Sequence, residues 1–173
     1  MADPFRLRLM KALTAQIKSI SKDDGFNFDL GDYDDADTRP RERVYRGRDI
    51  FGSTDEAPLV AVLEDPRSEP SENGSDARSA ANKFRVIIQG FCAEDQTGHP
   101  LDDAYLMSAD IIQALAAAKR PSREGILGMG NRVTAMNIGQ PVHRPGKDAI
   151  SDPAYWLVGV TFTIIEKLDD PYA

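Results

Sequence analysis

A run of alternating side chains near the end of the chain constrains the fold more than any other feature of the sequence. Five large apolar residues stand at every second position of this run: Trp156, Val158, Val160, Phe162 and Ile164. Successive side chains of a β-strand point to opposite faces of its sheet, so this spacing predicts a strand with one apolar face. We expect that face to form the centre of the hydrophobic core.

Four earlier segments also have the character of strands. Residues 84–91 place large apolar side chains at alternate positions, and short apolar runs occupy 58–64 and 133–138. The fourth segment, 44–48, is shorter and carries a tyrosine among arginines. Short β-branched and aromatic runs bounded by turn residues predict strands at all four places.

Two segments have the spacing of amphipathic helices. The apolar residues of the first recur three or four positions apart: Phe5, Leu9, Leu13, Ile17 and Ile20. Asp3 before Pro4 is expected to cap this helix, because a side-chain oxygen followed by proline is typical of a helix start. The second helix is predicted over 101–118 and ends before Pro121.

The order of these elements is helix, three strands, helix, two strands, without an alternating strand–helix–strand series. It predicts an α+β fold in which an antiparallel or mixed β-sheet carries both helices on one face. The 173 residues fit a single domain. Two polar stretches, 21–42 and 65–82, are expected to be mobile loops. Phe26, Phe28 and Leu30 alternate inside the first stretch in the manner of a short strand.

Composition excludes several classes of function. The net charge is −7, and a protein that clamps nucleic acid needs clustered cations. The acidic balance suits a passage through which DNA slides without sticking. The single cysteine, Cys92, cannot form an internal disulfide, which agrees with a reducing cytoplasm. Charged residues interrupt 1–20, so we expect no signal peptide, and no run reaches the roughly 20 apolar residues of a membrane span.

The sequence contains few residues in patterns typical of an active site. His99 and His143 lie far apart in predicted loops, and no local pattern brings either to a nucleophile and an orienting group. The glycine-rich segment 125–130 lacks the lysine of a phosphate-binding loop and stands in the wrong structural context. The aspartates of 29–37 lack the glycine and the final glutamate of a calcium loop. We expect no catalytic residue, no metal site and no cofactor.

Two blocks of opposite charge follow the first helix, an acidic one within 23–37 and an arginine-rich one within 39–48. Such blocks are commonly a solvated loop and its neighbour. They can also form a subunit interface, in which the acidic edge of one copy meets the basic edge of the next. Seven residues make up this candidate interface: Arg43, Tyr45, Arg46, Arg48, Asp32, Asp34 and Asp35.

The segment Val44-Tyr45-Arg46-Gly47-Arg48, followed by the strand Pro58-Leu59-Val60-Ala61-Val62-Leu63-Glu64, resembles the tail terminator (tail completion) family of long-tailed bacteriophages. The order of elements is similar over nearly the whole chain. The acidic run and the length of 65–82 depart from the shortest family pattern, which leaves the details of the interface open.

This resemblance implies a structural virion protein and no enzyme. Six copies would form a ring that caps the tail tube, ends its polymerisation and provides the surface for head–tail joining. The implied partners are copies of the chain itself, the tail tube protein and the head–tail connector protein. DNA would pass through the ring without sequence-specific binding. The implied location is the head-proximal end of the virion tail, after synthesis in the host cytoplasm.

Arg46 and Arg48 are expected to pair with acids of a neighbouring subunit or of the tube protein. Two alternatives remain open at this point. The first is a head–tail adaptor, another ring protein, which would bind on the portal side. The second is a small cytoplasmic enzyme that uses His99 or His143.

Overall fold

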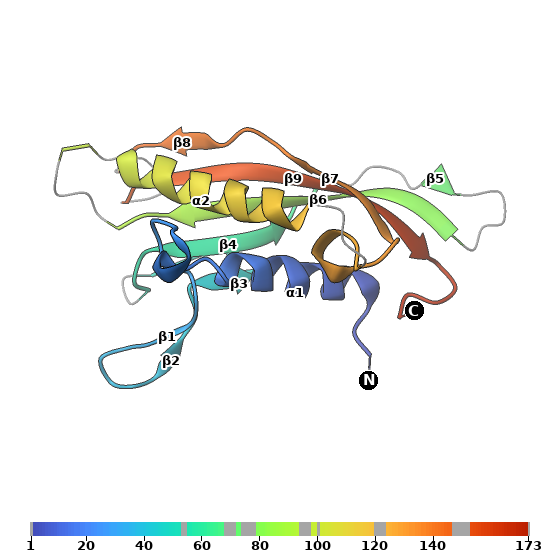
Figure 1. Cartoon of the computed structure of the whole chain (residues 1–173), viewed down its shortest axis with the longest axis horizontal. Coiled ribbons are helices and arrows are strands. Elements are labelled where there is room, and N and C mark those ends of the chain that lie inside the picture. Colours follow the sequence, from blue (N-terminus) through green and yellow to red (C-terminus); the bar gives the residue numbers. More distant parts are fainter. Residues whose placement is uncertain are drawn as a thin grey trace.

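The computed structural model describes most of the chain. The described residues are 2–52, 55–67, 72–73, 79–93, 98–99, 101–119, 124–146 and 153–172. Their centre is one mixed β-sheet with a path of five strands, and Figure 1 shows helices α1 and α2 lying along it. The path runs β3 (Val44–Arg46), β4 (Leu59–Glu64), β6 (Ser79–Phe91), β9 (Tyr155–Lys167), β7 (Val133–Ile138).

The two longest strands, β6 and β9, form the middle of the sheet. They pair antiparallel at every position from Ser79 with Lys167 to Phe91 with Tyr155. β4 and β7 add antiparallel strands on either side, whereas β3 joins β4 in parallel, which makes the sheet mixed. Two short strands complete it: β5 (Glu72–Asn73) beside β6 and β8 (Val142–Arg144) beside β9.

Both helices contribute to the same core. The buried residues of α1 (Phe5–Lys18) and α2 (Asp102–Ala118) join side chains of β6 and β9 in one hydrophobic cluster. The alternating residues of β9 lie in this cluster, and Trp156 and Phe162 are fully buried. The predicted α+β fold, with two helices on one face of the sheet, is confirmed. Neither helix of the described chain has the length and apolarity that a bilayer crossing needs.

The opposite face of the sheet carries a row of aromatic rings. Tyr45 contacts Phe51, Phe51 contacts Phe91, and Phe91 stacks on Tyr155, with ring centroids 5.3 to 6.1 Å apart. Tyr45, Phe91 and Tyr155 alternate with core residues on their strands and therefore point away from the helices. The segment after β3 folds back across this face through Phe51.

The structure corrects several predicted boundaries. Pro4 occupies the N-cap of α1 without a side-chain cap, and Asp3 forms an ion pair with Lys11 instead. β6 begins at Ser79, so the end of the expected loop 65–82 is strand. Residues 68–71 and 74–78 of that loop lie outside the described residues.

The first expected loop, 21–42, also contains regular structure. It begins with a short 3-10 helix, η1 (Lys22–Asp24), and ends with a hairpin of β1 (Tyr33–Asp34) and β2 (Pro40–Arg41). The alternating stretch Phe26–Leu30 forms no strand, although Leu30 is buried and both phenylalanines pack against the core. Figure 1 shows the β1–β2 hairpin extending away from the sheet. A second 3-10 helix, η2 (Ile126–Gly128), precedes β7.

Candidate functional site

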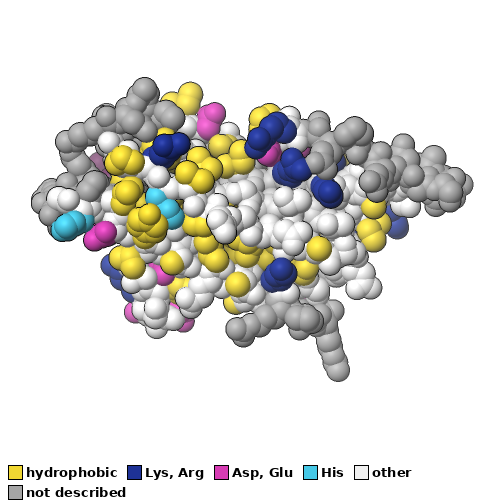
Figure 2. All heavy atoms as spheres, turned by 90° about the horizontal axis from the view of Figure 1, so that it is seen from above, with side chains coloured by type: hydrophobic (Ala, Val, Ile, Leu, Met, Phe, Trp, Pro, Cys, Tyr) yellow, Lys and Arg dark blue, Asp and Glu magenta, His cyan; other side chains and the backbone are white. Residues whose placement is uncertain are grey.

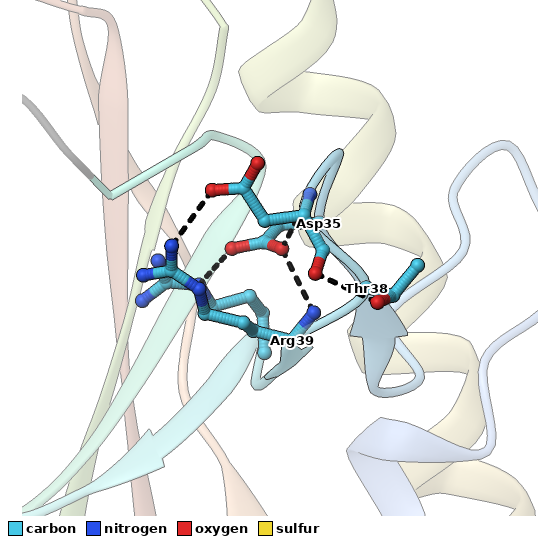
Figure 3. Close-up of polar contacts among 5 residues, drawn as sticks. Asp35, Thr38 and Arg39 are labelled. Carbon is cyan, nitrogen blue, oxygen red and sulfur yellow. Dashed lines mark hydrogen bonds and ion pairs between the residues drawn. The ribbon is translucent and has the colours of Figure 1, made fainter.

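The acidic and basic blocks meet within the chain at the turn of the β1–β2 hairpin. The carboxylate of Asp35 accepts hydrogen bonds from the backbone N–H groups of Asp37 (3.0 Å) and Arg39 (2.9 Å). Thr38 adopts a positive φ of 58° and donates its N–H to the Asp35 carbonyl. Figure 3 shows this network, which fixes the turn through one side chain.

Two ion pairs reinforce the hairpin. Asp35 contacts Arg41 Nε at 2.9 Å, and Asp37 contacts Arg39 at 2.8 Å. The backbone hydrogen bond from Arg39 is the main reason why the pKa of Asp35 lies below its ordinary value, and the Arg41 guanidinium lowers it further. Asp35 therefore stays ionised and keeps accepting these bonds at neutral pH. One of the seven predicted interface residues thus serves the hairpin itself.

The base of the hairpin is tied to the end of α1. Lys18 Nζ lies 2.7 Å from Asp32 Oδ1 and 3.1 Å from Glu42 Oε1. Burial alone would lower the pKa of Lys18, but the hydrogen bonds to both acids outweigh it and raise the pKa. Asp32, another predicted interface residue, therefore has an intramolecular partner.

Arg43 lies between the hairpin and the strand β4. Its guanidinium stacks on the ring of Tyr33, 3.9 Å from the ring centroid, and its Nη1 donates to the carbonyl of Pro58 at 3.3 Å. It also borders a groove of about 440 Å³. The groove is lined by Lys22, Asn27, Phe28, Asp29, Arg43, Pro58, Asp103 and Leu106.

Arg48 forms a partly buried ion pair within the chain, whereas we expected it to pair with a neighbouring subunit or the tube protein. Its Nη2 lies 2.5 Å from Asp55 Oδ2, and its guanidinium lies 4.8 Å from the ring centroids of both Tyr45 and Phe51. Burial raises the pKa of Asp55, yet hydrogen bonds from the Gly52 N–H and Arg48 more than compensate and lower it. Arg48 therefore holds the segment after β3 onto the aromatic row. Burial also raises the pKa of Tyr45.

Arg46 and Asp34 differ from the other predicted interface residues. Arg46 is exposed on β3, the last strand of the sheet path, and Asp34 is exposed on β1. Neither side chain forms a hydrogen bond or an ion pair with any residue in the described part of the chain. The structure thus separates five predicted residues whose side chains have partners within the chain from two whose side chains form no polar contact with the described residues.

Sequence reasoning missed the role of Asp110, a buried acid. It lies on the core side of α2 with 3% of its surface exposed. Its carboxylate accepts hydrogen bonds from Asn27 N, Asn27 Nδ2 and Phe28 N, at 2.8, 2.8 and 3.1 Å. This contact anchors the stretch before the hairpin to the core. An aspartate beside Ile111 on the apolar stripe of a helix is the signal that could have identified it.

The two histidines do not form a catalytic arrangement with the described residues around them. His143 stacks on Tyr105, with ring centroids 3.9 Å apart, and its Nε2 lies 2.9 Å from Ser108 Oγ. Ser108 is 2% exposed and donates its hydroxyl to the Tyr105 carbonyl. A nucleophile must be reachable by its substrate, so this pair is better suited to joining β8 to α2. Burial lowers the pKa of His143, and His99 is exposed.

Other reactive groups are equally constrained. Cys92 is buried, and burial raises the pKa of its thiol to about 12, so little thiolate exists at neutral pH. Within the described residues, no cluster of three or more histidine, cysteine, aspartate or glutamate side chains has the arrangement of a metal site.

The surface of the described residues also carries exposed apolar side chains. Figure 2 shows apolar side chains gathered next to a histidine on the face seen from above. Tyr105 of α2 is exposed and stacks on His143. Val142 of β8 and its cross-strand partner Leu157 are also exposed, but they alternate with His143 and Trp156 and therefore lie on the other face of the sheet. Patches of this kind on a protein surface mark contacts with other macromolecules.

Comparison with known proteins does not identify a family for this chain. No protein-family model matches the chain, and no curated protein sequence matches it either.

Proposed function

We propose that this chain is a structural subunit of a bacteriophage virion, of the tail terminator type. The observation that carries the proposal is the exposed β1–β2 hairpin, which is ordered by its own hydrogen bonds and stands beside an edge strand with an exposed arginine. Such an arm can contact a neighbouring copy. The family resemblance of the segments 44–48 and 58–64 points in the same direction.

In this proposal the protein acts by occupying a surface and performs no covalent chemistry. Copies associate head to tail, and contacts of this kind close into a ring when the rotation allows it. Six copies are expected. One face of the ring covers the last ring of tail tube protein and stops further addition, and the other receives the head–tail connector protein. The ring would reside at the head-proximal end of the tail.

DNA would pass through the ring without sequence-specific contacts. The net charge of −7 supports this part of the proposal, because phosphate binding requires clustered cations. The pairing of Asp35 with Arg41 and of Asp37 with Arg39 supports it too, since arginines neutralised within the chain are poorly placed to bind phosphate.

The mass of the purified protein and its effect on tube growth test the proposal together. We expect native mass spectrometry to show a closed oligomer, and we expect the protein to shorten tubes assembled from the tail tube protein of the same virion. An Arg46→Glu variant serves as the control that keeps the fold but changes the exposed edge. A protein that remains monomeric and leaves tube length unchanged would contradict the proposal.

Gold-labelled antibodies on intact particles provide the independent test. Label confined to the head-proximal end of the tail is the expected result. A ring that labels this joint but does not affect tube growth would favour the head–tail adaptor alternative. Intact particles without label would exclude both structural roles.

A further inference from the structure

The β1–β2 hairpin receives little stabilisation from the rest of the molecule. No side chain from Gly31 to Glu42 is buried, and the hairpin forms a sheet of its own. An isolated two-stranded hairpin is marginally stable in water. Its order here rests on the Asp35 turn and on the ion pairs at its base. A second surface that covers it would supply the stabilisation that the chain does not.

The hairpin has a free edge on β1. The hydrogen bond from Asp35 N to the Arg39 carbonyl sets the register, in which Asp34 lies opposite Pro40. In an antiparallel ladder, hydrogen-bonded residue pairs alternate with pairs that are not hydrogen-bonded. Asp35 and Arg39 form a hydrogen-bonded pair, so the backbone N–H and C=O of the neighbouring Asp34 point away from β2. Pro40 has no N–H to offer on the other edge. The edge of β1 is therefore the one equipped for further pairing.

The strand β3 has a matching free edge. Val60 N bonds to the Arg43 carbonyl, and Gly47 N bonds to the Val62 carbonyl, so alternate backbone groups of β3 face β4. The backbone groups of Arg46 consequently point outward, away from the sheet. β3 is the terminal strand of the described sheet path, and strands at sheet edges are ready templates for another strand.

The charges on these two edges are complementary. Asp34 and Arg46 carry opposite charges, both are exposed, and neither has an ion-pair partner among the described residues. The charged neighbours Asp32, Asp35 and Arg48 are already paired within the chain. Cross-strand pairs of opposite charge stabilise a strand pair and discriminate against other registers.

We infer that the β1–β2 hairpin of one copy pairs with the β3 edge of the next, with Asp34 opposite Arg46. This inference rests on the proposed ring and identifies its subunit contact. Each copy offers the hairpin to one neighbour and the β3 edge to the other, so the contact is heterologous and suits a ring. An exposed ion pair adds little affinity by itself. The backbone pairing and the covering of the hairpin therefore supply most of the association, and the charges set its register.

A charge exchange tests the inference. Asp34→Arg and Arg46→Asp should each raise the concentration needed for half-assembly by about tenfold or more, because like charges then face each other across the contact. The double variant restores opposite charges and should assemble nearly as the unmodified protein does. Asp24→Arg is the matched control, since it makes the same charge change at an exposed position of η1, outside the hairpin, and should leave assembly unaltered.

Cysteine cross-linking provides a second readout that does not depend on affinity. Mixed Asp34→Cys and Arg46→Cys chains should form a disulfide between the two variants, because directly opposed strand residues lie within disulfide reach. Neither variant alone should cross-link, and a mixture of Lys167→Cys with Arg46→Cys serves as the control. The buried Cys92 remains in place in all variants.

The outcomes separate the inference from the proposed function. Rings that tolerate both single charge reversals and give no mixed disulfide would overturn the inference and leave the proposed function standing. Cross-linking of Asp34→Cys with itself would also overturn it, because that product requires a two-fold contact. An unmodified protein that stays monomeric at every concentration would overturn both.

Discussion

The indole ring of Trp156 lies against the backbone of Gly90, its partner on the neighbouring strand β6. A Cβ atom at position 90 would overlap the indole at Nε1 and Cε2. The indole nitrogen is buried and has no hydrogen-bond partner among the described residues. The close approach thus depends on the absence of a side chain at Gly90 and locks one end of the β6–β9 pair.

Replacing Gly90 with alanine should destabilise the protein. The added methyl group would force the indole out of its position, and overpacking of this kind costs about 1–3 kcal/mol. The free energy of unfolding from denaturant titration measures the effect. Gly159→Ala is the matched control on the adjacent strand β9, because a Cβ there meets no atom within 4 Å. Equal stability of the two variants would contradict this account of the contact.

Truncating Phe162 to alanine should lower the free energy of unfolding more than the Gly90→Ala substitution does. Its side chain is fully buried in the cluster between the sheet and the helices. Removing a phenylalanine ring from a packed core costs roughly 3–5 kcal/mol, so Phe162→Ala should lower the melting temperature strongly. Leu157→Ala is the control on the same strand, because the Leu157 side chain points to the opposite face of the sheet and is 36% exposed. An unchanged melting temperature for Phe162→Ala would remove Phe162 from the core.

The carboxylate of Asp110 should hold the backbone around Asn27 and Phe28 in its observed conformation. Asp110→Asn replaces one accepting oxygen with an NH2 group that faces the donors of Asn27 and Phe28. A buried donor left without a partner costs about 1–3 kcal/mol. Hydrogen exchange of the backbone amides around Phe28 should become faster. Asp102→Asn, at an exposed position of the same helix that does not border the groove beside Phe28, should leave that exchange unaltered.

Glu166 should make stability depend on acid pH. Its two carboxylate oxygens receive Arg6 Nε at 2.7 Å and Nη2 at 2.8 Å, and this hydrogen bonding, opposed by burial, lowers the pKa of Glu166 below its ordinary value of 4.5. A lowered pKa means that the contact stabilises the fold fully above pH 4.5 and that its stabilisation is lost as pH falls through the folded pKa.

The Glu166→Gln variant provides the measurement. Glutamine does not titrate, so the stability difference between the unmodified protein and the variant should be greatest near neutral pH and shrink below pH 4.5. Thermal unfolding at several pH values gives this difference directly. A difference that stays constant from pH 7 to pH 3 would show that Glu166 contributes no pH-dependent stability.

Periodicity predicted the parts of the fold that bury one apolar face. The alternation in β9 and the helical spacing in α1 and α2 are local patterns, and the structure confirms all three elements. β8 carried no such signal, because prolines flank Val142–Arg144 and, among the described strands, it pairs with β9. The first residues of β6 were missed for a similar reason, since they are small or polar and pair with the distant end of β9.

The candidate site was less predictable because charge patterns do not reveal partners. The blocks of aspartates and arginines favoured a loop and an interface equally. Which acid meets which base depends on the turn at Thr38, whose positive φ brings Arg39 and Arg41 back to Asp35. Phe26 and Phe28 alternate as in a strand, but the backbone N–H groups of Asn27 and Phe28 donate hydrogen bonds to the Asp110 carboxylate, which holds this stretch in another conformation. The pairing of Asp34 with Arg46 stays a prediction.

The unbroken pairing of β6 with β9 limits how the length of this chain can change. A single residue inserted or deleted between Ser79 and Phe91 would turn every side chain beyond that point to the opposite side, placing core residues in water. The two strands can therefore lengthen or shorten only at their ends and only together. The β1–β2 hairpin has no buried side chains and carries no such restriction. Its length can therefore be adjusted to a different partner without rebuilding the core.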